Sequence, residues 1–249
     1  MKRYIKLFTN VSNWWKHFGV KFGVNREDPV VFLLPNGIKM EVPLSLYHEF
    51  KEIFLEDCYL RGLDQPLPER PVVVDIGANT GFFCLFVARM RPGARIVCCE
   101  PIPANLAQLS RNAEINPNID ITVLPVAVYG TSGSVKLLVE SQDAFTTAAT
   151  VFSVDGRIPL EVPCVTLQDL FEEQNLEKID LLKLDCEGSE YEILYRCPRK
   201  YLARVERIAM EVHKGTGPNH NMEAMAAYLK TGGFDINTAG HMLWAHKSR

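Results

Sequence analysis

The chain has 249 residues, of which 47% are hydrophobic, and a formal net charge of −3 at neutral pH. This length and apolar content suffice for one large α/β domain with an appendage, whereas no apolar run approaches the roughly 18 residues of a membrane span. The slightly acidic balance argues against a nucleic-acid partner. Seven cysteines without metal-ligand spacing, and no signal-peptide pattern, predict reduced thiols and a cytoplasmic protein.

Residues 1–26 carry six basic residues and no acid. Large apolar residues recur in this segment at roughly helical spacing, which predicts a basic amphipathic helix. They are Tyr4, Ile5, Phe8, Val11, Trp14, Trp15 and Phe18. Such a helix can pack on the core, cover the substrate as a lid, or make weak contact with an anionic membrane surface.

The next segment is expected to form a hairpin and a helix. Asn36-Gly37 supplies the turn between two apolar strands at 30–34 and 38–42. Residues 45–60 then have a helical pattern, and several prolines up to Pro71 mark a boundary.

We therefore divide the chain into an N-terminal cap, residues 1–69, and a core domain, residues 70–249. The core domain alternates predicted strands and helices, which indicates a parallel sheet with crossover helices. Strands are expected at 72–76, 95–99, 121–128 and 179–185, and helices at 82–91, 103–115 and 167–176, with irregular strand and turn over 144–165.

The first chemical motif follows the strand at 72–76. Asp75, Gly77, Asn79 and Gly81 form the pattern D-x-G-x-N-x-G where a strand meets a helix that Asn79 or Thr80 is expected to cap. The glycines allow a backbone to approach a ligand closely. Asn79 replaces the glycine that a dinucleotide pyrophosphate needs, so the pattern favours S-adenosylmethionine. Asp75 would hold the loop or reach the methionine ammonium through water.

Glu100 follows the next strand, 25 positions after Asp75. A carboxylate there can accept hydrogen bonds from both hydroxyls of a ribose. A nicotinamide enzyme would also place an acid at this point, so a nicotinamide-dependent oxidoreductase is one alternative function.

The second chemical motif spans residues 179–190. Lys183, Asp185 and Glu187 would share one face of a buried strand while it stays extended, at the sheet edge where ligands bind. A structural ion pair is the alternative. Glu190 would either favour the start of a helix or touch substrate.

His213 follows the apolar strand at 208–210 and is the expected general base, with Asp185 as the alternative base. Asp185, Glu187, Glu211 and His213 could together hold Mg²⁺ beside a substrate diol. A metal-free site is preferred, because Lys183 can supply the positive charge.

These motifs together resemble the FkbM-type family of S-adenosylmethionine-dependent methyltransferases. The resemblance rests on residues 75–83, 99–106, 126–130, 179–190 and 210–213. It implies a class I, Rossmann-like methyltransferase fold with a seven-stranded, mostly parallel sheet and helices on both faces. The small N-terminal helical and hairpin appendage lies outside the recognisable pattern.

The resemblance also implies a function and a set of roles. The expected reaction is O-methylation of a hydroxyl on a small molecule such as a sugar or secondary metabolite; N- or carboxyl-methylation of a small molecule or peptide, and a non-catalytic cofactor-binding protein, are alternatives. Loops over 141–156 would shape the acceptor pocket. The cofactor would contact Asp75, Gly77, Asn79, Gly81, Glu100, Val126, Ala127 and Asp185, while Lys183, Asp185, Glu187 and His213 would serve catalysis.

Overall fold

The computed structural model describes residues 2–141, 144–146, 149–150 and 156–248. Its centre is a seven-stranded sheet in the order β11-β12-β10-β9-β3-β4-β5. Every neighbouring pair is parallel except those that involve β12, which confirms the predicted mostly parallel sheet. The strands are β3 (Val72–Ile76), β4 (Arg95–Cys99), β5 (Asp120–Leu124), β9 (Leu181–Leu184), β10 (Arg207–Glu211), β11 (Phe234–Ala239) and β12 (Met242–Lys247).

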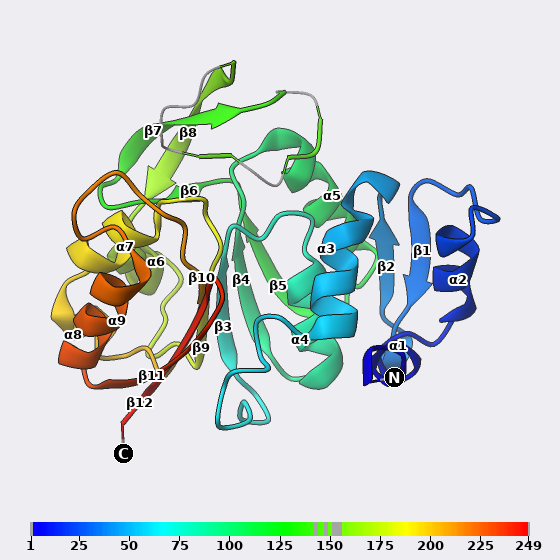
Figure 1. Cartoon of the computed structure of the whole chain (residues 1–249), viewed down its shortest axis with the longest axis horizontal. Coiled ribbons are helices and arrows are strands. Elements are labelled where there is room, and N and C mark those ends of the chain that lie inside the picture. The colour runs from blue at the N-terminus through cyan, green and yellow to red at the C-terminus, as the bar shows by residue number, and fades with distance from the viewer. Residues whose placement is uncertain (1, 142–143, 147–148, 151–155, 249) are drawn as a thin grey trace.

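Helices cover both faces of this sheet, as Figure 1 shows. The central strands are therefore buried on both sides, which explains their nearly continuous apolar sequences. Val73 belongs to the hydrophobic core on the side of α4 and α5, while Val74 belongs to the core on the other side. The helices are α4 (Phe82–Met90) and α5 (Pro103–Glu114) on one face, and α6 (Leu167–Glu173), α7 (Glu190–Arg196), α8 (Arg199–Leu202) and α9 (Met222–Thr231) on the other.

A separate three-stranded sheet comprises β6 (Ala127–Val128), β7 (Gly133–Val139) and β8 (Ile158–Val165). The predicted single strand over 121–128 is wrong, because β5 ends at Leu124 and β6 pairs with β8 instead. Pro125 stands between them and has no N–H to continue the ladder. The irregular strand and turn expected over 144–165 is a regular strand, β8, in its second half; part of its first half lies outside the described residues.

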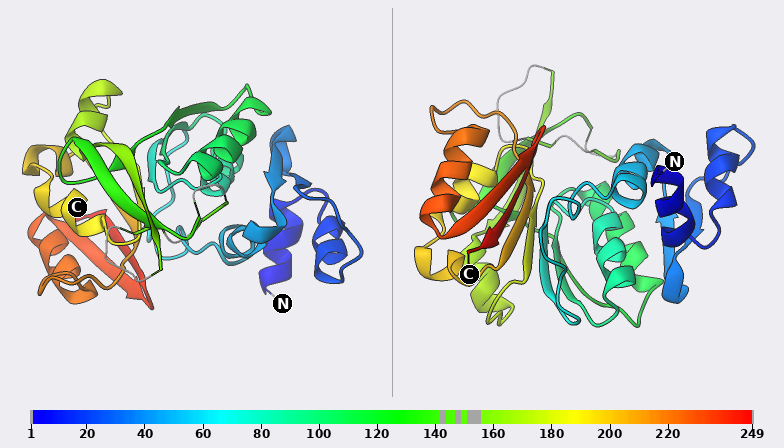
Figure 2. Two further views of the ribbon diagram at one scale, coloured as in Figure 1. Left: turned by 90° about the horizontal axis from the view of Figure 1, so that it is seen from above. Right: turned by 60° about the horizontal axis from the view of Figure 1, so that its bottom comes forward.

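The N-terminal unit sits at the opposite end of the molecule from the C-terminus (Figure 2). Its hairpin forms as predicted, whereas the single helix expected near the N-terminus is broken between Asn10 and Trp15. The helix expected over 45–60 is shorter and ends at Asp57, which has a left-handed φ of 58°. The elements are α1 (Lys2–Asn10), α2 (Trp15–Lys21), β1 (Val30–Leu33), η1 (Pro35–Gly37), β2 (Lys39–Val42), η2 (Leu44–Leu46), α3 (Tyr47–Lys51) and the π-helical turn η3 (Glu52–Glu56).

Hydrogen bonds and aromatic packing join the N-terminal unit to the core domain. The side-chain Oδ1 atoms of Asn112 on α5 and of Asn116 just after it accept hydrogen bonds from backbone N–H groups of β2, each at 2.9 Å. The ring of Phe54 packs edge-on against Phe86 of α4, with centroids 5.2 Å apart. The hydrophobic core therefore continues from the sheet into the N-terminal unit. Within the described residues, no helix is both long and apolar enough to cross a bilayer.

The loop between β3 and α4 is built from alternating left-handed residues. Gly77, Asn79 and Gly81 have φ values of 75°, 50° and 83°. Gly81 is the N-cap of α4, so the expected capping by Asn79 or Thr80 is wrong. A Cβ on Gly77 would lie 1.9 Å from the carbonyl oxygen of Asp185, because the loops after β3 and β9 touch there.

This contact predicts a large cost for Gly77→Ala. Gly37 is a matched control, because its φ of 76° is nearly the same and no atom lies within 4 Å of its added Cβ. We expect Gly37→Ala to lower the free energy of unfolding by about 1–2 kcal/mol from backbone strain alone. Gly77→Ala should cost about 3–5 kcal/mol, because overlap is added to strain. Denaturant unfolding measures both, and equal losses would refute the steric account.

Candidate active site

The site is organised around a buried ion pair between neighbouring strands. The register places Asp75 of β3 beside Lys183 of β9, and the Lys183 ammonium lies 3.0 Å from Asp75 Oδ1. Lys183 Nζ also donates a hydrogen bond to the carbonyl of Gly77 at 2.7 Å. Burial alone would lower the pKa of Lys183, but Asp75 and Asp185 raise it above its usual value. A buried cation thus holds the loop after β3.

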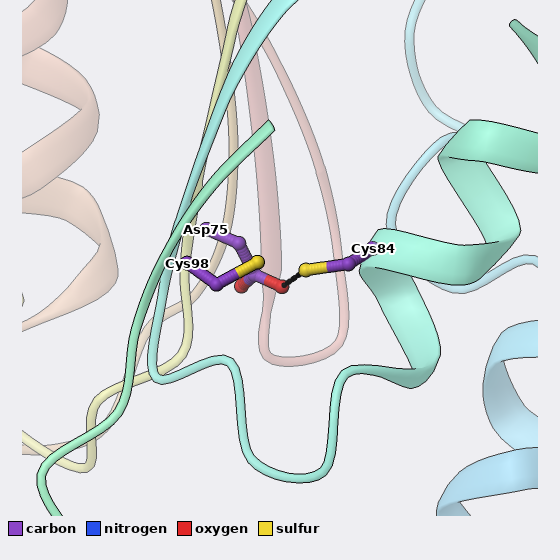
Figure 3. Close-up of side chains that lie close together, drawn as sticks. All are labelled: Asp75, Cys84 and Cys98. Atoms are coloured by element: carbon purple, nitrogen blue, oxygen red, sulfur yellow. Dashed lines mark hydrogen bonds between the residues drawn. The ribbon is translucent and has the colours of Figure 1, made fainter. Parts of the chain in front are cut away.

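Two cysteines complete the surroundings of Asp75 (Figure 3). Cys84 of α4 donates a hydrogen bond from Sγ to Asp75 Oδ2 at 3.2 Å, and Cys98 is the neighbour of Asp75 on β4. Burial raises the pKa of both thiols, so both carry their protons at neutral pH in this arrangement. Asp75 is fully buried and is not among the cavity-lining residues, which favours its holding the loop over its contacting a ligand.

A cavity of about 350 Å³ opens where β3, β4 and β9 end. The chain leaves β3 toward β4 and β5 on one side, while β9 and β10 lie on the other, which is the switch point where open α/β sheets bind ligands. The lining combines apolar side chains with carboxylates. The apolar residues include Ile102, Val126, Ala127, Val128 and Leu137, and the carboxylates are Glu49, Glu52, Glu100, Asp185, Glu187 and Glu211.

Glu100 lies at the end of β4 with its carboxylate turned toward the glycine-rich loop. Its oxygens accept hydrogen bonds from the backbone N–H groups of Asn79 and Ile102, each at 2.8 Å. Burial raises its pKa to about 7. The buried Oδ1 of Asn79 has no hydrogen-bond partner among the described residues, although Asn79 lines the cavity. A ligand that donates hydrogen bonds would satisfy this oxygen.

The loop after β9 differs from the predicted extended strand. β9 ends at Leu184, and Glu187 has a left-handed φ of 51°. The expectation that Lys183, Asp185 and Glu187 share one strand face is therefore wrong for Glu187. Glu190 is fully buried and accepts hydrogen bonds from the backbone N–H groups of Gly188 at 2.9 Å and Cys186 at 3.4 Å. Glu190 thus fixes the loop from inside and does not line the cavity.

His213 lies behind this loop. Its Nδ1 is 2.8 Å from Glu190 Oε1 and its Nε2 is 3.6 Å from Glu187 Oε2. Burial lowers the pKa of His213, but the hydrogen bond and charge of Glu190, with Glu187, outweigh it and raise that pKa to about 9. The imidazole is therefore protonated at neutral pH. Glu187, which does line the cavity, has its pKa raised to about 6 by burial.

A metal ion would need a different protonation state. One ligand atom each from Asp185, Glu211 and His213 lie within 4.8 Å of one another. The imidazole would have to lose its proton before it could coordinate a metal. The metal-free site therefore stays a prediction.

Tyr59 is a site residue that the sequence reasoning missed. Its hydroxyl donates a hydrogen bond to Asp185 Oδ2 at 2.5 Å, and Lys183 Nζ lies 5.1 Å from its ring centroid. Its backbone carbonyl accepts a hydrogen bond from Trp244 Nε1 at 2.7 Å, which anchors the segment on the sheet. Tyr59 belongs to the N-terminal unit and lies outside every motif of the sequence. Its position in the sequence therefore gave no indication that it contacts Asp185.

The cavity brings together most, but not all, of the residues predicted for the site. Asp75, Gly81 and His213 stand outside the described lining. The described lining also begins at His48, so the structure gives no support to a lid formed directly by residues 1–26. The predicted residues that line the cavity are Gly77, Asn79, Glu100, Val126, Ala127, Lys183, Asp185 and Glu187.

Comparison with known proteins identifies the family. The family described as Methyltransferase FkbM domain matches residues 75–236, so the chain belongs to the FkbM methyltransferase family. Methyltransferase sdnD of Sordaria araneosa is 29% identical over 225 residues, covering 79% of this chain and 84% of that protein. The 31-O-demethyl-FK506 methyltransferase FkbM of Streptomyces tacrolimicus is 29% identical over 235 residues, covering 82% of this chain and 88% of that protein.

A solved structure supports the fold. The crystal structure of Methyltransferase FkbM from Methylobacillus flagellatus KT matches with a TM-score of 0.54 at 15% identity, over 82% of this chain. The match covers 54% of that larger chain. The class I methyltransferase fold is confirmed, and the protein is an S-adenosylmethionine-dependent methyltransferase of the FkbM type. The family assignment decides against the nicotinamide-dependent alternative.

Proposed function

We propose that the cavity binds S-adenosylmethionine and that the enzyme methylates a hydroxyl group of a small molecule. The observation that carries this proposal is the position of Glu100 and Asn79 on one side of the same cavity as Asp185 and Glu187. Hydroxylated small molecules are also favoured by the name of the Streptomyces tacrolimicus relative, a 31-O-demethyl-FK506 methyltransferase.

The cofactor residues divide by chemistry. Glu100 has unused lone pairs for the two ribose hydroxyls, because each of its oxygens accepts one backbone hydrogen bond. Asn79 Oδ1 would accept from the ammonium of the methionine part, and Val126 and Ala127 would form the apolar wall beside adenine. Asp75 and Gly81 would shape the loop without touching the ligand.

The acceptor would lie beside the carboxylates other than Glu100, among them Asp185 and Glu187. The cofactor supplies an electrophilic methyl group on a sulfonium, and the protein aligns the acceptor oxygen with it and excludes water. Glu187 would take the hydroxyl proton, because it lines the cavity and its pKa of about 6 lies near the working pH. Asp185, held by Tyr59, would orient the acceptor. The protonated His213 would stabilise the ionised form of Glu187.

We predict that Glu100→Gln weakens S-adenosylmethionine binding by about 1.5–3 kcal/mol, because an amide cannot accept hydrogen bonds on both atoms. Wild-type affinity should increase as pH rises through about 7, where Glu100 ionises, and the variant should lose this dependence. Isothermal titration calorimetry measures both. Glu114→Gln, at an exposed position on α5, is the control. Unchanged affinity in Glu100→Gln would remove Glu100 from the cofactor site.

The pH profile of methyl transfer distinguishes Glu187 from His213 as the general base. If Glu187 is the base, kcat rises through an apparent pKa of about 6, and Glu187→Gln loses this limb and on the order of 10²–10⁴ in rate. If His213 were the base, the limb would lie near 9. A mass-spectrometric screen of alcohols first identifies an acceptor. A limb near 9 that His213→Gln abolishes would transfer the role to His213.

A further inference from the structure

A second cavity, of about 340 Å³, lies wholly within the N-terminal unit, between α1, α2 and α3. Its volume falls in the range of about 300–1,000 Å³ that is typical of ligand sites. None of its lining residues lines the active-site cavity. It is lined by Arg3, Tyr4, His17, Val20, Lys21, Tyr47 and Lys51.

Among the residues that the structure describes, the lining carries three cationic side chains and no carboxylate. Lys21 Nζ donates a hydrogen bond to the Tyr4 hydroxyl at 2.9 Å, and Lys51 Nζ lies 5.6 Å from the Tyr47 ring centroid. Neither ammonium has a carboxylate partner within the described residues. Arg3 lies 3.3 Å from Glu56, but both side chains are over 40% exposed, and exposed ion pairs are weak. The cavity therefore has an unbalanced positive charge.

His17 is the one neutral titratable side chain besides the two tyrosines in the described lining of this cavity. It is buried, and its Nδ1 lies 2.5 Å from the Tyr47 hydroxyl. Burial, followed by the charges of Lys21 and Arg3, lowers its pKa to about 4. His17 is thus neutral at physiological pH and can serve as a hydrogen-bond partner in a site whose charge comes from Arg3, Lys21 and Lys51.

Large apolar side chains project to solvent beside the cavity. Of the nine large hydrophobic residues that are exposed within the described chain, six belong to residues 5–24. Phe18 stacks on Tyr4, which lines the cavity, and on the exposed Phe22, at centroid distances of 5.7 and 6.4 Å. Phe18 thus connects the cavity to the exposed apolar residues. We call these residues the apolar collar: Ile5, Phe8, Trp14, Trp15, Phe22 and Val24.

Three cationic side chains around one cavity favour the binding of an anion with several oxygen atoms, such as a phosphate group. A free phosphate would not require the apolar collar, whereas exposed aromatic residues beside basic ones are typical of segments that lie in the headgroup region of a bilayer. We propose that this cavity binds the phosphate of an anionic lipid headgroup while the apolar collar enters the membrane interface. The site is independent of the methyl-transfer reaction.

Sedimentation with phosphatidylcholine vesicles, with and without phosphatidic acid, tests the proposal on the full chain. The protein should bind only vesicles that contain phosphatidic acid. Replacing two cavity cations together, Lys21→Gln with Lys51→Gln, should lower the partition coefficient roughly 30-fold. The control pair, Lys16→Gln with Arg26→Gln, removes the same charge outside the cavity and should lower it no more than roughly threefold. Thermal unfolding verifies that each variant is folded.

A second experiment distinguishes a lipid headgroup from a soluble phosphate as the ligand of this cavity. Trp15→Ser with Phe22→Ser, at positions that are 59% and 69% exposed, should weaken vesicle binding but leave the affinity for glycerol 3-phosphate unchanged. Equal losses in the cavity and control pairs would overturn the site, because attraction would then be diffuse. Binding of glycerol 3-phosphate without cavity-dependent vesicle binding would overturn the lipid as its source. Binding of neither would overturn the proposal.

Discussion

The architecture of the active site depends on one buried charge pair, Lys183 with Asp75. An ammonium in the middle of a sheet is tolerable only with a close carboxylate and further hydrogen bonds. The parallel register of β3 and β9 supplies the carboxylate, and the Gly77 carbonyl supplies the hydrogen bond. The same contacts draw together the loops after these strands, until Gly77 touches the backbone of Asp185. A core interaction thus sets the spacing between the loops after β3 and β9, which both line the cavity.

The N-terminal unit completes the site from outside the family pattern. Tyr59 fixes the Asp185 carboxylate, and Glu49 and Glu52 add two carboxylates to the lining of the cavity. α3 lies between the two cavities: Tyr47 and Lys51, one turn apart, line the second cavity, while other residues of the same segment line the first. α1 packs on η3 through Leu7, and the Asn10 side chain donates a hydrogen bond to the backbone carbonyl of Phe54. Residues 1–26 thus support the segment that carries Glu52 without lining the cavity themselves.

Sequence reasoning succeeded where local pattern and chemistry coincide. The glycine spacing of Gly77 and Gly81 and the acid at Glu100 depend on short stretches of chain, and the structure places Gly77 and Glu100 at the cavity as expected. It failed where contacts between residues far apart in the sequence determine the geometry of the site. Tyr59 reaches Asp185 across 126 positions, and the clamp by Glu190 turns Glu187 away from the strand face. His213 is likewise protonated because the buried Glu190 carboxylate lies beside it. The sequence does not indicate that these two residues are in contact.

The most direct test of this account is a double-mutant cycle on Asp75→Asn and Lys183→Met, read as the free energy of unfolding in denaturant. Each single change leaves a buried charge without its closest partner of opposite charge and should cost about 3–5 kcal/mol. The double variant removes both charges, so it should lose far less than the sum of the two single losses. Losses that simply add would contradict the claim that this ion pair holds the two loops of the active site together.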